Sequence, residues 1–111
     1  MDHENFSFEG QMLRKSEKTN DFGKKLILKI YTYRLVGKEL YVFRKSDSND
    51  HKSMHSLTGV FIRDAADEKF DETAVLFSFK LISPRKKVRQ YYFTDIKQKL
   101  KWMAAIKQSI G

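Results

Sequence analysis

Basic side chains gather in three short regions of this sequence, and clustered Lys and Arg side chains bind anions such as phosphates. Residues 14–25, 44–52 and 85–89 together hold 12 Lys or Arg against 4 Asp or Glu. The whole chain of 111 residues has 22 Lys plus Arg, 14 Asp plus Glu and a net charge of +8. The three regions therefore account for the entire excess, and the rest of the chain is neutral. This pattern predicts an anionic partner that meets these regions.

Catalytic and metal chemistry has no comparable support in the sequence. The chain has no cysteine, which excludes disulfide scaffolds, zinc ribbons and thiol nucleophiles. It also has no G-x-S-x-G motif and no phosphate-cradling glycine loop. His51 and His55 are four residues apart, but they fall in an expected loop and a short strand, without a third ligand nearby. The acidic run 64–72 lacks the spacing of a calcium loop. We predict a protein that is not an enzyme and needs no metal or cofactor.

The composition is that of one folded domain. Apolar residues make up 41% of the chain and aromatic residues 14%, which excludes a disordered polybasic tail. A chain of 111 residues is long enough to bury one hydrophobic core. No run approaches the roughly 20 apolar residues of a membrane span, and the N-terminus has no signal-peptide core. We therefore expect a cytoplasmic, monomeric domain over residues 1–111.

Hydrophobic periodicity predicts many short strands followed by one helix. The expected strands cover residues 6–15, 25–35, 39–45, 54–58, 60–63, 74–82 and 88–93. The expected loops cover residues 15–24, 46–53, 64–73 and 83–87. Asp95 is a good N-cap for a helix over 96–110, with Gln98 placed to complete a capping box. The apolar stripe of that helix is Ile96, Leu100, Met103, Ile106 and Ile110, and Lys97, Lys101 and Lys107 should be solvated. The fold class is mainly β, a barrel or sandwich with a C-terminal helix.

Several segments, in this order and spacing, resemble the pleckstrin-homology (PH) domain family over nearly the full chain. The segments are Glu9–Arg14, Tyr33–Gly37, Leu40–Phe43, Leu57–Ile62, Phe77–Leu81, Arg89–Phe93 and Lys101–Ile106. The last one contains Trp102, which matches the most dependable residue of the family. The resemblance implies a seven-stranded, strongly bent antiparallel barrel or sandwich, capped at one end by the C-terminal α-helix. Because Met1 and Gly111 lie near the expected ends of this fold, we expect a domain taken from a larger parent protein.

The resemblance also implies a ligand site, since the family binds inositol phosphates between the loops that follow strands one, three and six. Those three loops coincide with the three basic regions. Arg14 and Lys29 fall on basic positions of the family motif, and Lys52 falls on the basic position that opens strand four. Tyr31 stands where the motif has an Arg, and Val42 stands where a ligand-contacting Tyr often occurs. Since a guanidinium fork is what grips a particular phosphate, we expect charge-driven binding of modest selectivity.

We therefore predict a non-catalytic membrane-targeting module that binds anionic phospholipid headgroups, with phosphoinositides favoured, and associates peripherally with the membrane. The expected lipid-binding or phosphate-binding residues are Arg14, Lys15, Lys24, Lys25, Lys29, Arg44, Lys52, Arg85, Lys86 and Lys87. The alternative is a PH module for protein–protein interaction with weak or no lipid binding, which the missing motif Arg and the acidic run favour. Nucleic acid is disfavoured as a partner, because nothing beyond charge offers base-reading geometry.

Two aromatic residues allow more than one interpretation. Trp102 lies beside the helical stripe, so we expect it in the core and not at an interface. Phe22 lies in a polar segment, where burial in the core is hard to arrange. It either inserts between lipid headgroups or folds back over the mouth of the barrel.

Overall fold

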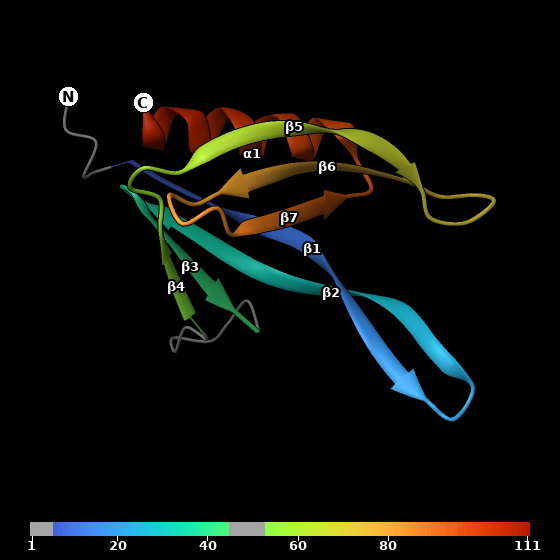
Figure 1. Cartoon of the computed structure of the whole chain (residues 1–111). Helices are drawn as coiled ribbons and strands as arrows, with labels where there is room; N and C mark the ends of the chain where they lie inside the picture. Colours follow the sequence, from blue (N-terminus) through green and yellow to red (C-terminus); the bar gives the residue numbers. More distant parts are fainter. Residues whose placement is uncertain (1–5, 45–52) are drawn as a thin grey trace.

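A computed structural model describes residues 6–44 and 53–111 of the chain. Seven strands form one antiparallel sheet in the order β4-β3-β2-β1-β7-β6-β5, and a helix follows (Figure 1). The strands are β1 (Ser7–Asn20), β2 (Gly23–Val36), β3 (Glu39–Phe43), β4 (Ser53–Ser56), β5 (Phe61–Lys69), β6 (Val75–Ile82) and β7 (Val88–Phe93). The helix is α1 (Ile96–Ile110). The predicted fold class, mainly β with one C-terminal helix, is confirmed.

The core lies between the bent sheet and α1, and alternate residues of the strands fill it. Trp102 of α1 is fully buried at its centre, beside buried side chains such as Tyr33, Phe79 and Tyr91. The ring of Phe8 meets Trp102 edge-on, with ring centroids 4.8 Å apart. The expected core position of Trp102 is therefore confirmed, and its indole ring closes this end of the barrel.

The helix begins and ends where the sequence predicts, but it buries a different face. The Asp95 carboxylate accepts a hydrogen bond of 2.9 Å from the Lys97 amide, so the N-cap is confirmed. Leu100, expected in the apolar stripe, is 56% exposed, while Lys99 is only 4% exposed. Ile96 is exposed as well, so the predicted apolar stripe was wrong at Leu100 and at Ile96. The reason is that α1 is oriented so that the large Trp102 ring is buried. Lys99 lies one helical turn before Trp102 on the same face, so it also points toward the sheet.

Lys99 can be buried because its ammonium has a carboxylate partner on a neighbouring strand. Its Nζ lies 2.6 Å from Oδ1 of Asp64 on β5. Near the other end of α1, the buried Ser109 hydroxyl donates a hydrogen bond to the carbonyl of Gly37. The lysines predicted to be solvated, Lys97, Lys101 and Lys107, are exposed.

The prediction of a loop at residues 15–24 was wrong. β1 and β2 stay paired out to Asn20 and Gly23, and only Asp21 and Phe22 form the turn. The Asn20 side-chain oxygen accepts a hydrogen bond from the Phe22 amide, and Gly23 has a φ of +111°. Both faces of this segment are largely exposed to solvent, so its side chains show no apolar alternation, although backbone pairing still makes it a strand. We call residues 14–31 the distal hairpin, because this part of β1 and β2 extends beyond the barrel (Figure 1).

The prediction of an acidic loop at residues 64–73 was also wrong for the first half of that range. Asp64 to Lys69 continue β5, which pairs with β6 and has an irregularity between Ala65 and Glu68. β5 lies at the edge of the sheet and exposes most of its side chains, so charged residues are tolerated there. The turn itself follows, where the Asp71 carboxylate accepts hydrogen bonds from the amides of Thr73 and Ala74.

The other two basic regions differ in how far they are described. Residues 45–52, including Lys52 and His51, lie outside the described residues. The turn between β6 and β7 is the one predicted, with hydrogen bonds between Ser83 and Lys87 and from the Lys86 amide to Ser83. Lys86 has a φ of +66°, in the left-handed region.

In the described part of the chain, α1 is too short and too polar to cross a lipid bilayer.

Candidate anion-binding site

A polar pocket lies where the distal hairpin leaves the barrel. Its volume is about 300 Å³, and its lining residues are Arg14, Lys15, Ser16, Lys29 and Tyr31. Arg14 of β1 and Lys29 of β2 are directly opposite each other in the strand register, so their side chains share one face of the ribbon. Like charges placed opposite each other repel, and an anion between them relieves that repulsion. The predicted site residues Arg14 and Lys29 are thus brought together here, and Lys15 borders the pocket.

An aromatic surface holds Arg14 in place. Its guanidinium carbon lies 5.1 Å from the centre of the Tyr91 ring, a cation–π geometry. The rings of Tyr33 and Tyr91 meet edge-on at 5.4 Å, and Tyr31 meets Tyr33 in the same way at 6.4 Å. Burial, and next the neighbouring Tyr91, raise the pKa of Tyr33 although Arg14 opposes the shift. The hydroxyl of Tyr33 therefore stays protonated and can donate a hydrogen bond.

A second guanidinium enters the barrel from β7. The Nε atom of Arg89 is buried and has no hydrogen-bond partner among the described residues, and the same is true of the Tyr91 hydroxyl. Neither Arg89 nor Arg14 forms an ion pair within the described part of the chain. A buried polar group without a partner costs about 1–3 kcal/mol, and a charged one costs more. An anion at the barrel mouth can therefore offset the cost of the unpartnered Arg89 Nε and can also pair with Arg14.

His55 of β4 faces the same interior space. It is paired across the strands with Leu40 of β3, which is fully buried, and it is itself half-buried. Burial, then the charges of Arg89 and Arg14, lower the pKa of His55 to about 4. The imidazole is therefore neutral at physiological pH. Its pKa also indicates that Arg14, Arg89 and His55 share one electrostatic environment, which we call the barrel mouth.

Arg89 and His55 are site candidates that the sequence analysis did not select. The strand position expected for His55 is confirmed, but no anion-binding role was assigned to it. Arg89 was counted in the third basic region and was left out of the contact residues. The available signal was alternation, because Arg89 shares its strand face with Tyr91 and Phe93, both of which are buried.

Lys15 lines the pocket but already has an anionic partner. Its Nζ lies 3.1 Å from Oε1 of Glu68 on β5 and 4.7 Å from the centre of the Tyr92 ring. In the register Lys15 faces Leu28, so its side chain leaves the opposite face of the ribbon from Arg14. Its ammonium is consequently less available to a ligand than that of Lys29.

The remaining predicted residues lie apart from the pocket. Lys24 and Lys25 are exposed near the end of the distal hairpin, where Lys24 is 4.0 Å from Glu17. Arg44 is exposed at the end of β3, and Lys52 lies outside the described residues. Arg85, Lys86 and Lys87 are exposed in the β6–β7 turn. Figure 1 shows this turn well separated from the end of the hairpin. The structure therefore assembles one cationic mouth with two outlying basic groups.

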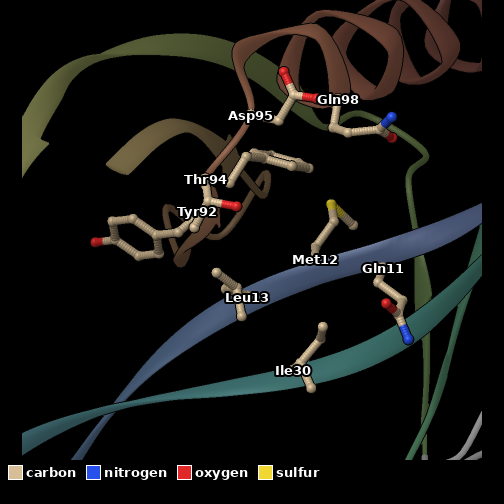
Figure 2. A pocket seen from close by; sticks show the side chains of 9 residues that line it. Gln11, Met12, Leu13, Ile30, Tyr92, Thr94, Asp95 and Gln98 are labelled. Carbon is tan, nitrogen blue, oxygen red and sulfur yellow. The ribbon is translucent and has the colours of Figure 1, made fainter. Parts of the chain in front are cut away.

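A second pocket, of about 390 Å³, lies on the other side of the ribbon. Its lining residues come from β1, β2 and the junction of β7 with α1 (Figure 2), and they are Gln11, Met12, Leu13, Ile30, Tyr92, Phe93, Thr94, Asp95 and Gln98. Asp95 is its one charged lining residue, and this carboxylate caps the helix. The pocket is mainly apolar and has no cation to hold a phosphate.

No family model matches the sequence, and no curated protein matches it. Solved structures do match. The carboxyl-terminal PH domain of pleckstrin, in complex with D-myo-Ins(1,2,3,5,6)P5, has a TM-score of 0.70 and 14% identity, covering 95% of this chain and 96% of that one. The PH domain of ArhGAP27 has a TM-score of 0.66 and 17% identity, covering 96% of this chain and 100% of that one.

A third match is to a much longer chain. An activated truncation of Vav1 has a TM-score of 0.69 and 21% identity, and the match covers 97% of this chain and 27% of that one. At such identities the likeness is one of fold. The chain has the pleckstrin-homology fold, as its sequence motifs predicted.

Proposed function

We propose that this pleckstrin-homology domain is a non-catalytic module that binds anionic phospholipid headgroups at its barrel mouth. The observation that carries the proposal is the pair Arg14 and Arg89, two guanidinium groups without a carboxylate partner in the described part of the chain. With Lys29 they offer three cationic side chains to one ligand. Phosphate is the anion that such an arrangement suits, because guanidinium forks bind its oxygens in pairs.

Arg89 also compensates for the absence of an arginine at position 31. Tyr31 occupies the position where the family motif has a second guanidinium, and Arg89 supplies a guanidinium from β7 instead. Two cations on different strands suit a headgroup with more than one phosphate better than a single phosphate diester. Phosphoinositides are therefore the favoured lipids. The complex of the pleckstrin domain with an inositol pentakisphosphate supports the choice, since it has the same fold.

The outlying basic groups add attraction to the membrane as a whole. Lys24, Lys25 and the turn residues 85–87 are exposed, and each contributes about 1 kcal/mol near an anionic surface. Salt weakens this contribution. Phe22, at the tip of the hairpin, is 98% exposed, so the interpretation that it folds back over the mouth was wrong. It is free to insert between headgroups once the lysines have brought the tip to the surface. The module would then associate peripherally with a cytoplasmic leaflet.

The test is sedimentation with phosphatidylcholine vesicles, with and without phosphatidylinositol bisphosphate. We expect Arg14→Gln with Arg89→Gln to weaken binding to the phosphoinositide vesicles by about 10-fold to 100-fold, because charge-assisted hydrogen bonds are lost. Arg63→Gln is the matched control, since Arg63 is an exposed arginine of β5. Lys86→Glu with Lys87→Glu should release the domain from any anionic vesicle. Vesicle binding that survives both double variants contradicts the proposal.

A further inference from the structure

An apolar row crosses β5, β6 and β7 on the face of these strands that points away from the core. Phe61 of β5 is directly opposite Ile82 of β6, and Ile82 is directly opposite Val88 of β7. Ile62 and Leu81, the chain neighbours of Phe61 and Ile82, pack in the core. Because side chains along a strand alternate between its two faces, Phe61, Ile82 and Val88 point outward. We call these three residues the outer row.

The outer row is open to solvent. Phe61 is 70% exposed and Val88 is 54% exposed, with the half-buried Ile82 between them. The helix does not cover the row, because α1 packs on the other face of these strands, where Phe79 is buried in one cluster with Trp102. Single exposed apolar residues are common on proteins, whereas apolar residues that adjoin one another are typical of an interaction surface.

A pair of cations lies beside the outer row on the same face. Arg63 of β5 and Lys80 of β6 are directly opposite each other, two residues along their strands from Phe61 and Ile82. Arg63 is exposed and Lys80 is half-buried, and neither forms an ion pair within residues 6–44 and 53–111. Like charges in directly opposite positions destabilise a sheet. An anionic group beside the outer row relieves this repulsion.

The turn between β6 and β7 holds this surface in shape. The Ser83 amide donates a hydrogen bond of 2.9 Å to the carbonyl of Lys87, and the Lys86 amide donates one of 2.8 Å to the carbonyl of Ser83. Gly59, just before β5, lies so close to the turn that an added Cβ would be 2.9 Å from Cγ of Pro84. The surface is therefore formed before a partner arrives, so binding costs little ordering.

Charge decides what can cover the outer row. Arg63 and Lys80 flank it on one side, and the exposed basic turn residues 85–87 flank it at the strand ends. A second copy of the chain brings cations against cations, which repel. A bilayer meets the cations but not the apolar row, because side chains on a flat strand face reach no further than the cations beside them. An acidic protein surface with its own apolar stripe meets both.

The spacing of the outer row suits an α-helix. Neighbouring strands are about 4.8 Å apart, so the three side chains span about 10 Å. Residues at positions i, i+3 or i+4, and i+7 lie on one face of a helix and also span about 10 Å, because each residue rises about 1.5 Å. A helix that lies along the row therefore places one apolar side chain over each strand, and its flanks face the cations on both sides.

We infer that the outer row binds an amphipathic helix of a partner protein, in which an apolar stripe is flanked by Glu or Asp. The stripe packs on the outer row, and the carboxylates pair with Arg63, Lys80 and the turn residues. This surface is separate from the headgroup site, because Val88 and Arg89 are adjacent in β7 and point to opposite faces. The domain can therefore hold an inositol phosphate and the helix at the same time.

The probe is a synthetic peptide of about 18 residues, long enough to form a helix, with Leu at every third or fourth position and Glu on both flanks of the Leu stripe. Isothermal titration calorimetry measures its binding, and amide chemical shifts from nuclear magnetic resonance locate it. We expect shifts in residues 61–63, 80–82 and 88–90. A peptide of the same composition without a stripe should bind at least about tenfold more weakly, because it cannot cover the row.

The first variant is Phe61→Thr with Val88→Thr, which removes the exposed ends of the outer row and keeps β-branched residues in the strands. Its matched control is Phe70→Thr with Val75→Thr, an exposed Phe and an exposed Val where β5 ends and β6 begins. We expect the first variant to bind the striped peptide at least about tenfold more weakly, because aromatic anchors dominate such interfaces. The control should bind it as the unaltered domain does.

The second variant is Arg63→Gln with Lys80→Gln, which tests the charge pairing. It should bind the striped peptide about fivefold to tenfold more weakly. A peptide with Gln in place of Glu should bind this variant and the unaltered domain equally, because it has no carboxylate to lose.

Binding of phosphoinositide vesicles should stay intact in Phe61→Thr with Val88→Thr, which separates this surface from the headgroup site. Loss of vesicle binding in that variant would assign the outer row to the membrane and overturn the inference. Failure of the striped peptide to bind, equal losses in the variant and its Phe70 and Val75 control, or amide shifts confined to other strands would overturn it as well.

Discussion

The barrel mouth and the distal hairpin both carry cations and meet at Arg14, yet they hold their cations in opposite ways. In the mouth, Arg14 lies against Tyr91, and Arg89 is buried at Nε without a partner. In the hairpin, Lys18, Lys24 and Lys25 are exposed. A fixed, partly desolvated cation can distinguish one headgroup from another, whereas an exposed lysine attracts any anionic surface. The comparison indicates that selectivity belongs to the mouth and general attraction to the hairpin.

The largest contrast concerns one aromatic residue of the barrel core and one of the distal hairpin. We expect Trp102→Ala to lower the free energy of unfolding by about 3–5 kcal/mol, because it empties the centre of the core. Phe22→Ala should change it by less than about 0.5 kcal/mol, because this ring is exposed at the hairpin tip. Urea denaturation measures both. A large loss of stability in Phe22→Ala would contradict an exposed, independent hairpin.

The next contrast tests selectivity with a soluble ligand, which removes the membrane surface from the measurement. We expect Arg89→Gln to weaken binding of an inositol polyphosphate by at least about tenfold, because a guanidinium beside the phosphate is lost. Lys25→Gln should change it by less than about twofold, because an exposed lysine contributes little. Calorimetry at two salt concentrations measures both. Equal losses would mean that the hairpin lysines belong to the headgroup site.

A third prediction compares two cations of the barrel, the buried and paired Lys99 and Arg89, whose Nε is buried and unpaired. Asp64→Asn should lower the free energy of unfolding by about 1–3 kcal/mol, because it leaves the buried Lys99 ammonium without its carboxylate. Arg89→Met should instead leave stability unchanged or raise it by about 1 kcal/mol, because it removes a cation that has no partner. Thermal unfolding checks both. A strongly destabilised Arg89→Met variant would show that Arg89 is structural.

The smallest effect is a pH dependence confined to the mouth. The pKa of His55 is lowered to about 4 in the folded protein, so between about pH 6.5 and pH 4 the unfolded chain takes up a proton that the folded one does not. The free energy of unfolding should therefore fall as the pH is lowered through this range. We expect a loss of about 1 kcal/mol, since the ring is only half-buried and solvent screens its surroundings. His55→Gln should flatten this dependence, and an unchanged slope would mean that burial and the two arginines do not lower the pKa of His55.

The sequence was most informative where local pattern and burial agree. The seven strands, the helix over 96–110, its cap at Asp95 and the burial of Trp102 all follow from alternation, capping chemistry and the family motifs. It was least informative where a strand has no buried face. Residues 15–24 looked like a loop because both of their faces meet solvent, and only pairing with the facing strand makes them part of a hairpin.

In the candidate site, too, some residues could be predicted from the sequence and others could not. Sequence reasoning selected Arg14 and Lys29, and the cross-strand register brings them together. It also selected Lys15, which the fold places beside Glu68, a residue 53 positions away along the chain. It left out Arg89, although alternation with Tyr91 and Phe93 places that side chain on the inner face of β7; the pairing of β7 with its neighbours then decides that this face meets Arg14.

What the sequence by itself determined is the class of fold, its helix and the concentration of its net charge in three regions. Short-range periodicity and composition are sufficient for these features. What only the tertiary structure decided is which cations meet. Long-range strand pairing turns Arg14 and Arg89 toward one interior and carries Lys24 and Lys25 away from it. The rotation of α1 around Trp102 likewise decided that Lys99, and not Leu100, is buried. Each of these outcomes depends on a contact between residues far apart in the chain, which no local pattern contains.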